Sequence, residues 1–315
     1  MNTIQKYAVT FGILLAVAVS VWGYQKLTAV GPVEIPRSAV FLRPVESVPI
    51  LIDESATESG IPKASDLVLS AESVYISDLN SGSVLYKKND RALRSPASTT
   101  KLLTALVALE AYALDDVLTV TIKETRTEGN VVGFYTGEEL TVLNVLKAML
   151  IPSGNDAAYV LANSYPAGYD AFIERMNTLA IELGMLGSHF ENPAGFDGDM
   201  HYTTAYDLAI LAREAMKEQV IRDIVKTKEL SITDVSGLRT HVLETTNQLL
   251  IENSQVVGIK TGTTEKAGQV LVTQYEVGEG GVLVVLMGSQ DRFSDTSAIV
   301  DWIYTQYQWE LYSDS

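Results

Sequence analysis

The segment RSPASTTKL, residues 94–102, carries the strongest local signals for structure and chemistry in this chain. Ser95 is a suitable N-cap and Pro96 suits the first helical position, so a helix is predicted to begin here. Ser98 and Lys101 are three residues apart in its first turn, and side chains at that spacing share one face of a helix. A serine hydroxyl is a poor nucleophile until a base removes its proton, and a neutral lysine can act as that base. Alone, the Ser-x-x-Lys pattern is weak, because about one chance match is expected in this length.

A second lysine motif could complete such a site. Burial and a nearby cation both lower the pKa of a lysine, so another positive charge is expected close to Lys101. The motif Lys260-Thr261-Gly262 lies at the end of an apolar strand, and its glycine would let a ligand approach the backbone closely. The alternative for this motif is a solvated strand end.

A third motif, Ser153-Gly154-Asn155, follows a predicted helix, 141–150, that is broken at Pro152. A serine and an amide two residues apart in a tight turn can point into the same cleft. The alternative is an ordinary turn between helices, with Asn155 as the N-cap of the second helix.

The segments around these motifs predict an α+β domain. A hairpin is expected from residues 74–76 and 84–86 around the turn at 80–83. Strands from both chain ends would form one sheet, with a helical lobe inserted between them. Further helices are predicted at 156–163, 169–183, 204–217 and finally 294–309, and further strands at 229–232, 256–264, 269–275 and 281–287.

The three motifs resemble, in their order along the chain, the active-site motifs of class A β-lactamases and penicillin-binding proteins. The wider sequence is similar to the D-alanyl-D-alanine carboxypeptidases, the low-molecular-weight penicillin-binding serine peptidases, over roughly residues 66–310. The segments that carry the similarity are 94–102, Gly137-Glu138 with 146–157, 192–197 with 201–205, and 258–264 with Ala267-Gly268.

This resemblance implies a β-lactamase/D,D-peptidase-like fold with an antiparallel sheet, and a role for each motif residue. Ser98 would attack the carbonyl between two D-alanines and become acylated, with Lys101 as the proton acceptor. Ser153 would help to relay the proton to the leaving amine, and Asn155 would hold a substrate amide. The sequence departs from the family at Gln269, where an aromatic residue is commoner, so the substrate loop could differ in preference.

The resemblance also implies how the terminal carboxylate of a substrate would be recognised. Lys260 would lower the pKa of Lys101 and attract the carboxylate, and Thr261 would hydrogen-bond it. The backbone N–H groups of Ser98 and Thr263 would form the oxyanion hole. Arg292 stands at the position that matches a carboxylate-binding arginine of the family. The alternative is that it is solvated, as a loop arginine more commonly is. The residues expected to contact substrate here are Lys260, Thr261, Gly262, Thr263 and Arg292.

Composition excludes several other classes of protein. The 315 residues contain 23 basic and 39 acidic side chains, a formal charge of −16, so a nucleic-acid partner is not expected. There are no cysteines and only three histidines, which excludes a thiolate nucleophile and disfavours a multi-histidine metal site. No metal and no organic cofactor is predicted. His201 is expected to organise a loop rather than take part in catalysis.

The N-terminal part of the chain predicts attachment to a membrane. Residues 8–24 are apolar and uncharged, which favours a signal anchor at 1–24, with a cleaved signal peptide as the alternative. Residues 25–66 are rich in proline and acidic side chains and predict an extended linker that could include a short ordered piece. The peptidase domain, 67–315, would lie on the outer face of the bacterial cytoplasmic membrane. It would lack the C-terminal β-rich domain and amphipathic tail that family members commonly carry.

These expectations define a membrane-tethered serine D-Ala-D-Ala carboxypeptidase. Its substrates would be peptidoglycan stem peptides, and β-lactams would inhibit it covalently. One alternative is a class A-like β-lactamase, but such enzymes place Glu-x-x-Leu-Asn between the second and third motifs, where this chain has Glu191-Asn192-Pro193. The other is a non-catalytic penicillin-binding sensor or wall-binding module.

Overall fold

The computed structural model describes residues 47–51, 67–277 and 280–311 of the chain. The predicted N-terminal anchor, 1–24, lies outside the described residues, as does most of the predicted linker. Within the described ranges, no helix combines the length and the apolar character needed to cross a bilayer.

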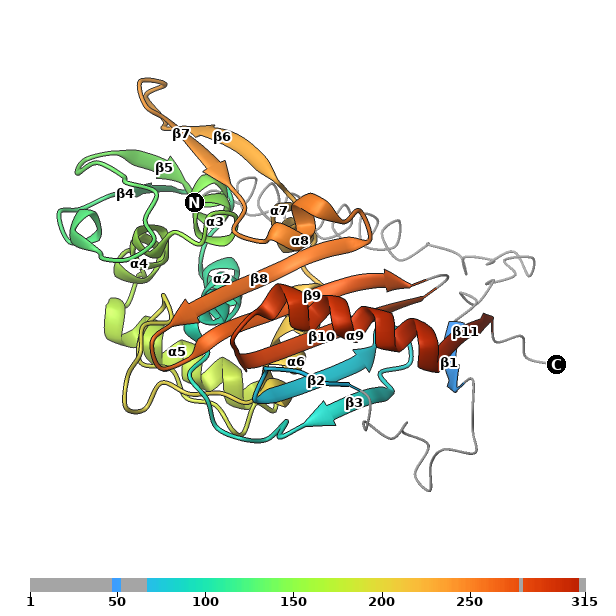
Figure 1. The fold of residues 1–315 in the computed structure, drawn as a ribbon. Coiled ribbons are helices and arrows are strands. Elements are labelled where there is room, and N and C mark those ends of the chain that lie inside the picture. The colour runs from blue at the N-terminus through green and yellow to red at the C-terminus, as the bar shows by residue number, and fades with distance from the viewer. Residues whose placement is uncertain (1–46, 52–66, 278–279, 312–315) are drawn as a thin grey trace, which may run out of the picture. The chain divides into compact units, whose positions relative to one another are not determined.

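A five-stranded antiparallel sheet forms the centre of the domain, in the order β3-β2-β10-β9-β8 (Figure 1). β2 and β3 form the predicted hairpin, and three strands from the last third of the chain complete the sheet. The prediction of an α+β fold with one sheet built from both chain ends is confirmed. The strands are β2 Ser73–Asp78, β3 Val84–Lys88, β8 Val256–Thr264, β9 Gly268–Val277 and β10 Gly280–Ser289.

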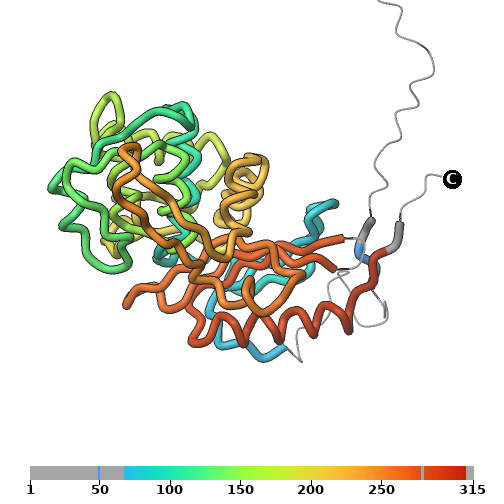
Figure 2. The backbone as a smooth tube through the Cα atoms, turned by 90° about the horizontal axis from the view of Figure 1, so that it is seen from above, coloured from blue at the N-terminus to red at the C-terminus, as the bar shows by residue number. Residues whose placement is uncertain are grey.

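Both faces of this sheet are buried, because successive side chains point alternately into two hydrophobic clusters. On β2, Val74 and Ile76 belong to the cluster with helix α9, Arg292–Gln306, whereas Tyr75 belongs to the cluster of the helical lobe. Figure 2 accordingly shows the sheet between α9 and the helical lobe. Each fully buried Val, Leu or Ile contributes about 1.5–3 kcal/mol, so the sheet is a firm support for the strands that carry the site.

The helical lobe is inserted between β3 and β8, as predicted. Helix α2 lies at its centre, because its apolar residues are buried on almost every side. Two helices begin with side-chain caps: Thr141 accepts a hydrogen bond from the N–H of Asn144, and Thr204 from that of Asp207. The longer helices are α2 Lys101–Ala111, α3 Val142–Leu150, α4 Asn155–Asn163, α5 Tyr169–Glu182 and α6 Ala205–Ala215.

Shorter elements complete the lobe, and most of them had no clear sequence signal. They are the turns η3 Ala97–Thr100 and η4 Glu124–Arg126, the helices α7 Gln219–Val225 and α8 Gln248–Glu252, the strand pair β4 Val117–Thr119 and β5 Glu139–Thr141, and the pair β6 Glu229–Thr233 and β7 Thr240–Glu244.

The C-terminal end differs from the prediction of one helix over 294–309. Helix α9 ends at Gln306, and Tyr307–Leu311 form strand β11, which pairs antiparallel with β1, Ser47–Leu51. The pairing partner comes from the far end of the chain, so the local sequence could not reveal it. β1 lies within residues 25–66, the predicted linker.

Candidate active site

Ser98 lies in the 3-10 turn η3, which precedes α2, rather than in the first turn of a regular α-helix. The prediction of Ser95 as the helix N-cap is wrong, because its hydroxyl donates instead to the carboxylate of Asp197 at 2.6 Å. Ala97 has a φ of +49°, a left-handed conformation that is rare outside glycine and is found at functional sites. The spacing of three residues nevertheless brings Ser98 and Lys101 together.

Lys101 is completely buried beside Ser98. Its Nζ atom lies 2.8 Å from Ser98 Oγ, 2.7 Å from Asn155 Oδ1 and 2.6 Å from the carbonyl oxygen of Ala194. The oxygen atoms of Asn155 and Ala194 therefore hold the amine against the Ser98 hydroxyl. This is the contact that proton transfer from Ser98 to Lys101 requires.

Lys260, on β8, is the second buried cation that the sequence predicted. Its Nζ atom donates to Ser153 Oγ at 2.7 Å and to the Thr261 carbonyl at 3.0 Å. Burial, aided by the charge of Arg292, lowers the pKa of Lys260 to about 7. Burial, followed by the charge of Lys260, lowers the pKa of Lys101 well below its ordinary value. A nearby positive charge in a poorly solvated site makes it easier for an amine to lose its proton.

Ser153 contacts Lys260 from the tight turn before α4, and Asn155 contacts Lys101 from the first position of α4. Ser153 has a φ of +67°, and a Cβ at Gly154 would lie 2.8 Å from the Ala148 carbonyl oxygen, so this turn packs closely against α3. Asn155 is the first residue of α4 and not its N-cap. Its Nδ2 donates to the Glu128 carbonyl at 2.9 Å, which leaves Oδ1 as the acceptor for Lys101.

Strand β8 closes against the Ser98 turn at Gly262. A Cβ at Gly262 would lie 2.9 Å from the backbone nitrogen of Ser98. The 3-10 turn that carries Ser98 therefore packs directly against this glycine, and Thr263 is the next residue of the strand. Arg292 is also brought here, since its Nη1 donates to the Gly262 carbonyl at 2.9 Å and to Thr263 Oγ1 at 2.6 Å.

The remaining motif residue, Thr261, is held by a residue outside the motifs. Its Oγ1 lies 2.6 Å from Thr246 Oγ1, just before α8. The structure thus gathers all the residues that the motifs predicted, and it links them through direct contacts among η3, α2, α4, β8 and α9.

The loop at 192–197 forms a further wall of the site. Asn192 Oδ1 accepts hydrogen bonds from three consecutive backbone N–H groups, at residues 194–196, with lengths of 3.2, 2.8 and 3.0 Å. Gly195 has a φ of +92°, and a Cβ there would lie 1.9 Å from the carbonyl oxygen of Ala97. Only glycine fits at this contact with the Ser98 turn.

Replacing Gly195 with alanine is expected to lower the free energy of unfolding by about 3 kcal/mol or more, because both the backbone conformation and the contact become unfavourable. Gly184→Ala is the matched control, since Gly184 has a φ of +82° but nothing within 4 Å of the added Cβ, and about 1 kcal/mol is expected for it. Urea unfolding measures both values. Equal losses for the two variants would contradict the argument from close contact.

His201 organises the loop, as the sequence suggested. Its Nδ1 accepts the backbone N–H of Glu191 at 2.9 Å, so the neutral ring carries its proton on Nε2, which lies 3.0 Å from Thr100 Oγ1. Burial lowers the pKa of His201 to about 4, which keeps the ring neutral at pH 7. Thr100 in turn donates to the Ala97 carbonyl at 2.9 Å, so His201 supports the Ser98 turn.

Sequence reasoning missed several side chains that support this site. Asn192 shapes the loop beside Ser98, Thr246 contacts Thr261, and Asp156 binds the N–H groups of Val132 and Gly133 at 3.0 and 2.8 Å. Asn192 lies in a segment that carried the family resemblance, which was a usable signal. Asp156 also lies in such a segment, 146–157, whereas Thr246 lies outside all of them and had no signal.

The fold and the buried Ser98–Lys101 pair define a class of protein, the active-serine enzymes with a β-lactamase-like fold. Comparison with known proteins narrows this class. A family model described as D-alanyl-D-alanine carboxypeptidase matches residues 61–291. The chain belongs to this family, and the predicted type of enzyme, a serine-type D-Ala-D-Ala carboxypeptidase, is confirmed.

Individual relatives agree with this assignment. The chain is 31% identical over 254 residues to D-alanyl-D-alanine carboxypeptidase DacF of Bacillus subtilis, covering 78% of this chain and 65% of that protein. It is 32% identical over 265 residues to a D-alanyl-D-alanine endopeptidase of Escherichia coli, covering 82% and 85%. The crystal structure of a Streptomyces DD-transpeptidase superposes with a TM-score of 0.72 at 32% identity, covering 75% of this chain and 98% of that one.

Proposed function

We propose that this protein removes the terminal D-alanine from peptidoglycan stem peptides through an acyl-enzyme on Ser98. The observation that carries the proposal is the 2.8 Å contact between Ser98 Oγ and the buried amine of Lys101. Neutral Lys101 takes the hydroxyl proton as Oγ attacks the carbonyl between the two D-alanines. The backbone N–H groups of Ser98 and Thr263 stabilise the negative charge that develops on the carbonyl oxygen.

Breakdown of the tetrahedral intermediate breaks the peptide bond and needs a proton on the leaving amine. Lys101 holds that proton after the attack, and Ser153 relays it to the amine of the departing D-alanine. Water then hydrolyses the ester on Ser98, which releases the shortened peptide and restores the hydroxyl. Asn155 holds the amide of the acyl part throughout.

Recognition of the free chain end falls to the side of the site formed by β8 and α9. Lys260 and Arg292 supply positive charge, and Thr261 and Thr263 supply hydroxyl groups for the terminal carboxylate. The Nε atom of Arg292 is buried without a hydrogen-bond partner in the described structure, which leaves it available to an acceptor.

A β-lactamase is the weaker proposal. The carboxylate of Glu191, the acidic residue between the second and third motifs, accepts the N–H of Met200 at 3.2 Å and lies against Gly198. It is thus engaged in its own loop, and it makes no hydrogen bond with Ser98 or Lys101 in the described part of the chain. Without a carboxylate to activate water, hydrolysis of a penicilloyl ester should be slow.

The test is to incubate the protein with a D-Ala-D-Ala pentapeptide and, separately, with benzylpenicillin. D-Alanine release is expected from the peptide, and mass spectrometry should show one long-lived penicilloyl group per protein, on Ser98. Absence of D-alanine release would leave only a binding role, and turnover of many penicillin equivalents would favour the β-lactamase.

Membrane attachment through residues 1–24 is part of the proposal, supported by the uncharged apolar run at 8–24. It would place the domain on the outer face of the cytoplasmic membrane, where stem peptides are found. Fractionation of cells that express the chain with and without residues 1–24 tests this part separately.

A further inference from the structure

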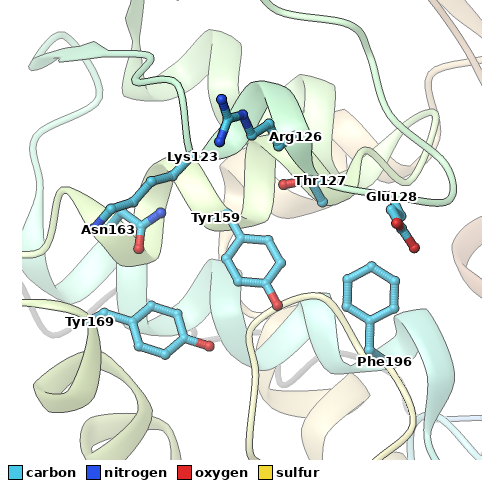
Figure 3. Close-up of a pocket in the computed structure, with 8 residues that line it drawn as sticks. All are labelled: Lys123, Arg126, Thr127, Glu128, Tyr159, Asn163, Tyr169 and Phe196. Atoms are coloured by element: carbon cyan, nitrogen blue, oxygen red, sulfur yellow. The ribbon is translucent and has the colours of Figure 1, made fainter.

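A cavity of about 610 Å³ opens next to loops that support the active site. Figure 3 shows Tyr159 between Tyr169 and Phe196, with residues of the segment 123–128 across from them. The rings of Tyr159 and Tyr169 stack, with centroids 6.1 Å apart and an angle of 5° between their planes. The residues that line the cavity are Lys123, Arg126, Thr127, Glu128, Tyr159, Asn163, Tyr169 and Phe196.

The cavity shares two of its walls with the active site. The carbonyl of Glu128 accepts the hydrogen bond that orients Asn155 toward Lys101. Phe196 directly follows Gly195, which packs against the carbonyl of Ala97. A ligand in the cavity would therefore contact the same loops that hold the nucleophile.

Helix α4 leads from one site into the other. Asn155, Tyr159 and Asn163 are spaced four residues apart, so they form one row on the helix, with about 6 Å between neighbours. An extended peptide advances about 3.3 Å per residue, so two residues span the distance from Asn155 to Tyr159. The residues that would bind the terminal carboxylate of the substrate lie on β8 and α9. The earlier residues of a bound peptide can therefore extend along α4.

The charges of the cavity favour an anionic group. Lys123 and Arg126 are both exposed, and neither cation has a side-chain partner among the described residues. Only Glu128 opposes them within the lining. This local excess of positive charge occurs in a chain whose formal charge is −16, and it lies over a largely aromatic floor.

We propose that this cavity is a subsite for the acyl part of the substrate, and that Lys123 and Arg126 bind a carboxylate on the residue two positions before the acylated alanine. The inference rests on the proposed function. The aromatic rings of the cavity contact the aliphatic part of that same peptide residue.

The experiment compares D-alanine release from three N-acetylated peptides that all end in D-Ala-D-Ala. One is a pentapeptide with glutamate as its second residue, the next has glutamine there, and the third is a tripeptide that lacks the first two residues. The unmodified protein should prefer glutamate over glutamine about fivefold in kcat/KM, the size expected for exposed ion pairs. The double variant Lys123→Gln, Arg126→Gln should lose that preference and cleave the tripeptide at an unchanged rate.

Lys87→Gln is the matched control, because Lys87 is an exposed cation on β3, at the far edge of the sheet from β8. It should retain the fivefold preference. Equal rates for the glutamate and glutamine peptides with the unmodified protein, or a preference that persists in the double variant, would overturn the subsite. An equal loss on the tripeptide would also overturn it, by showing a general effect on the site. Failure of the proposed function is a different result, in which the unmodified protein releases no D-alanine from any peptide.

Discussion

The variant Ser98→Ala is expected to release no D-alanine and to form no covalent adduct with benzylpenicillin. Both reactions need an oxygen nucleophile at this position, and a methyl group cannot supply one. Loss of the nucleophile in a serine hydrolase costs about 10⁴-fold or more in turnover. Initial rates of D-alanine release and mass spectrometry after penicillin treatment measure the two effects.

The control is Ser297→Ala, which removes an exposed hydroxyl on α9 whose hydrogen bond is made within the helix, to Phe293. This variant should keep full activity and full labelling. Unfolding curves should show Ser98→Ala folded, because Ser98 Oγ makes one hydrogen bond that is not needed for packing. Penicillin labelling that survives in Ser98→Ala would place the nucleophile elsewhere.

The second large effect is expected for Lys101→Met. Methionine fills the same buried volume without an amine, so the fold should survive while the proton acceptor of Ser98 is lost. General-base catalysis contributes about 10²–10⁴-fold, and a loss of about 10³-fold in the rate of penicillin acylation is expected. Stopped-flow acylation measures the loss, and an unchanged rate would exclude Lys101 as the base.

The pH dependence separates a base from a merely structural lysine. Only the neutral amine accepts a proton, so the acylation rate of the unmodified protein should rise with pH through the pKa of Lys101, which lies well below its ordinary value. Lys260→Met removes a nearby positive charge, which raises the pKa of Lys101, so the rising limb should move to higher pH. Lys87→Gln should leave the limb in place. A flat profile up to pH 10 would contradict the assignment of the base.

Most of the secondary structure of this protein could be predicted from local sequence. Alternation of apolar residues predicted the strands that became β2, β3, β9 and β10, and helical spacing predicted α3, α5 and α6 within a few residues. These signals depend on near neighbours in the chain, which is why they can be seen without a structure. The order of the three motifs likewise led to the prediction of Ser98, Lys101 and the other motif residues as the site.

Features that depend on distant partners were mispredicted or unseen. The first three residues of β11, 307–309, were predicted as the end of the final helix, because the strand partner β1 lies at the other end of the described chain. Ser95 was assigned as a helix cap, although the carboxylate that binds it belongs to Asp197. The cavity beside α4 also had no sequence signal, since its lining comes from the segment 123–128, two helices and Phe196.

The sequence by itself was enough to predict the order of the elements, the types of side chain expected at the site and the resemblance to a family. All three depend on short segments and on the spacing between them. Folding decided the protonation chemistry. Lys101 and Lys260 are ordinary lysines in the sequence. Their pKa values are lowered because packing removes water from both amines and sets the charge of Lys260 near Lys101 and that of Arg292 near Lys260. Desolvation and distance are properties of neighbours in space, and no stretch of sequence contains them.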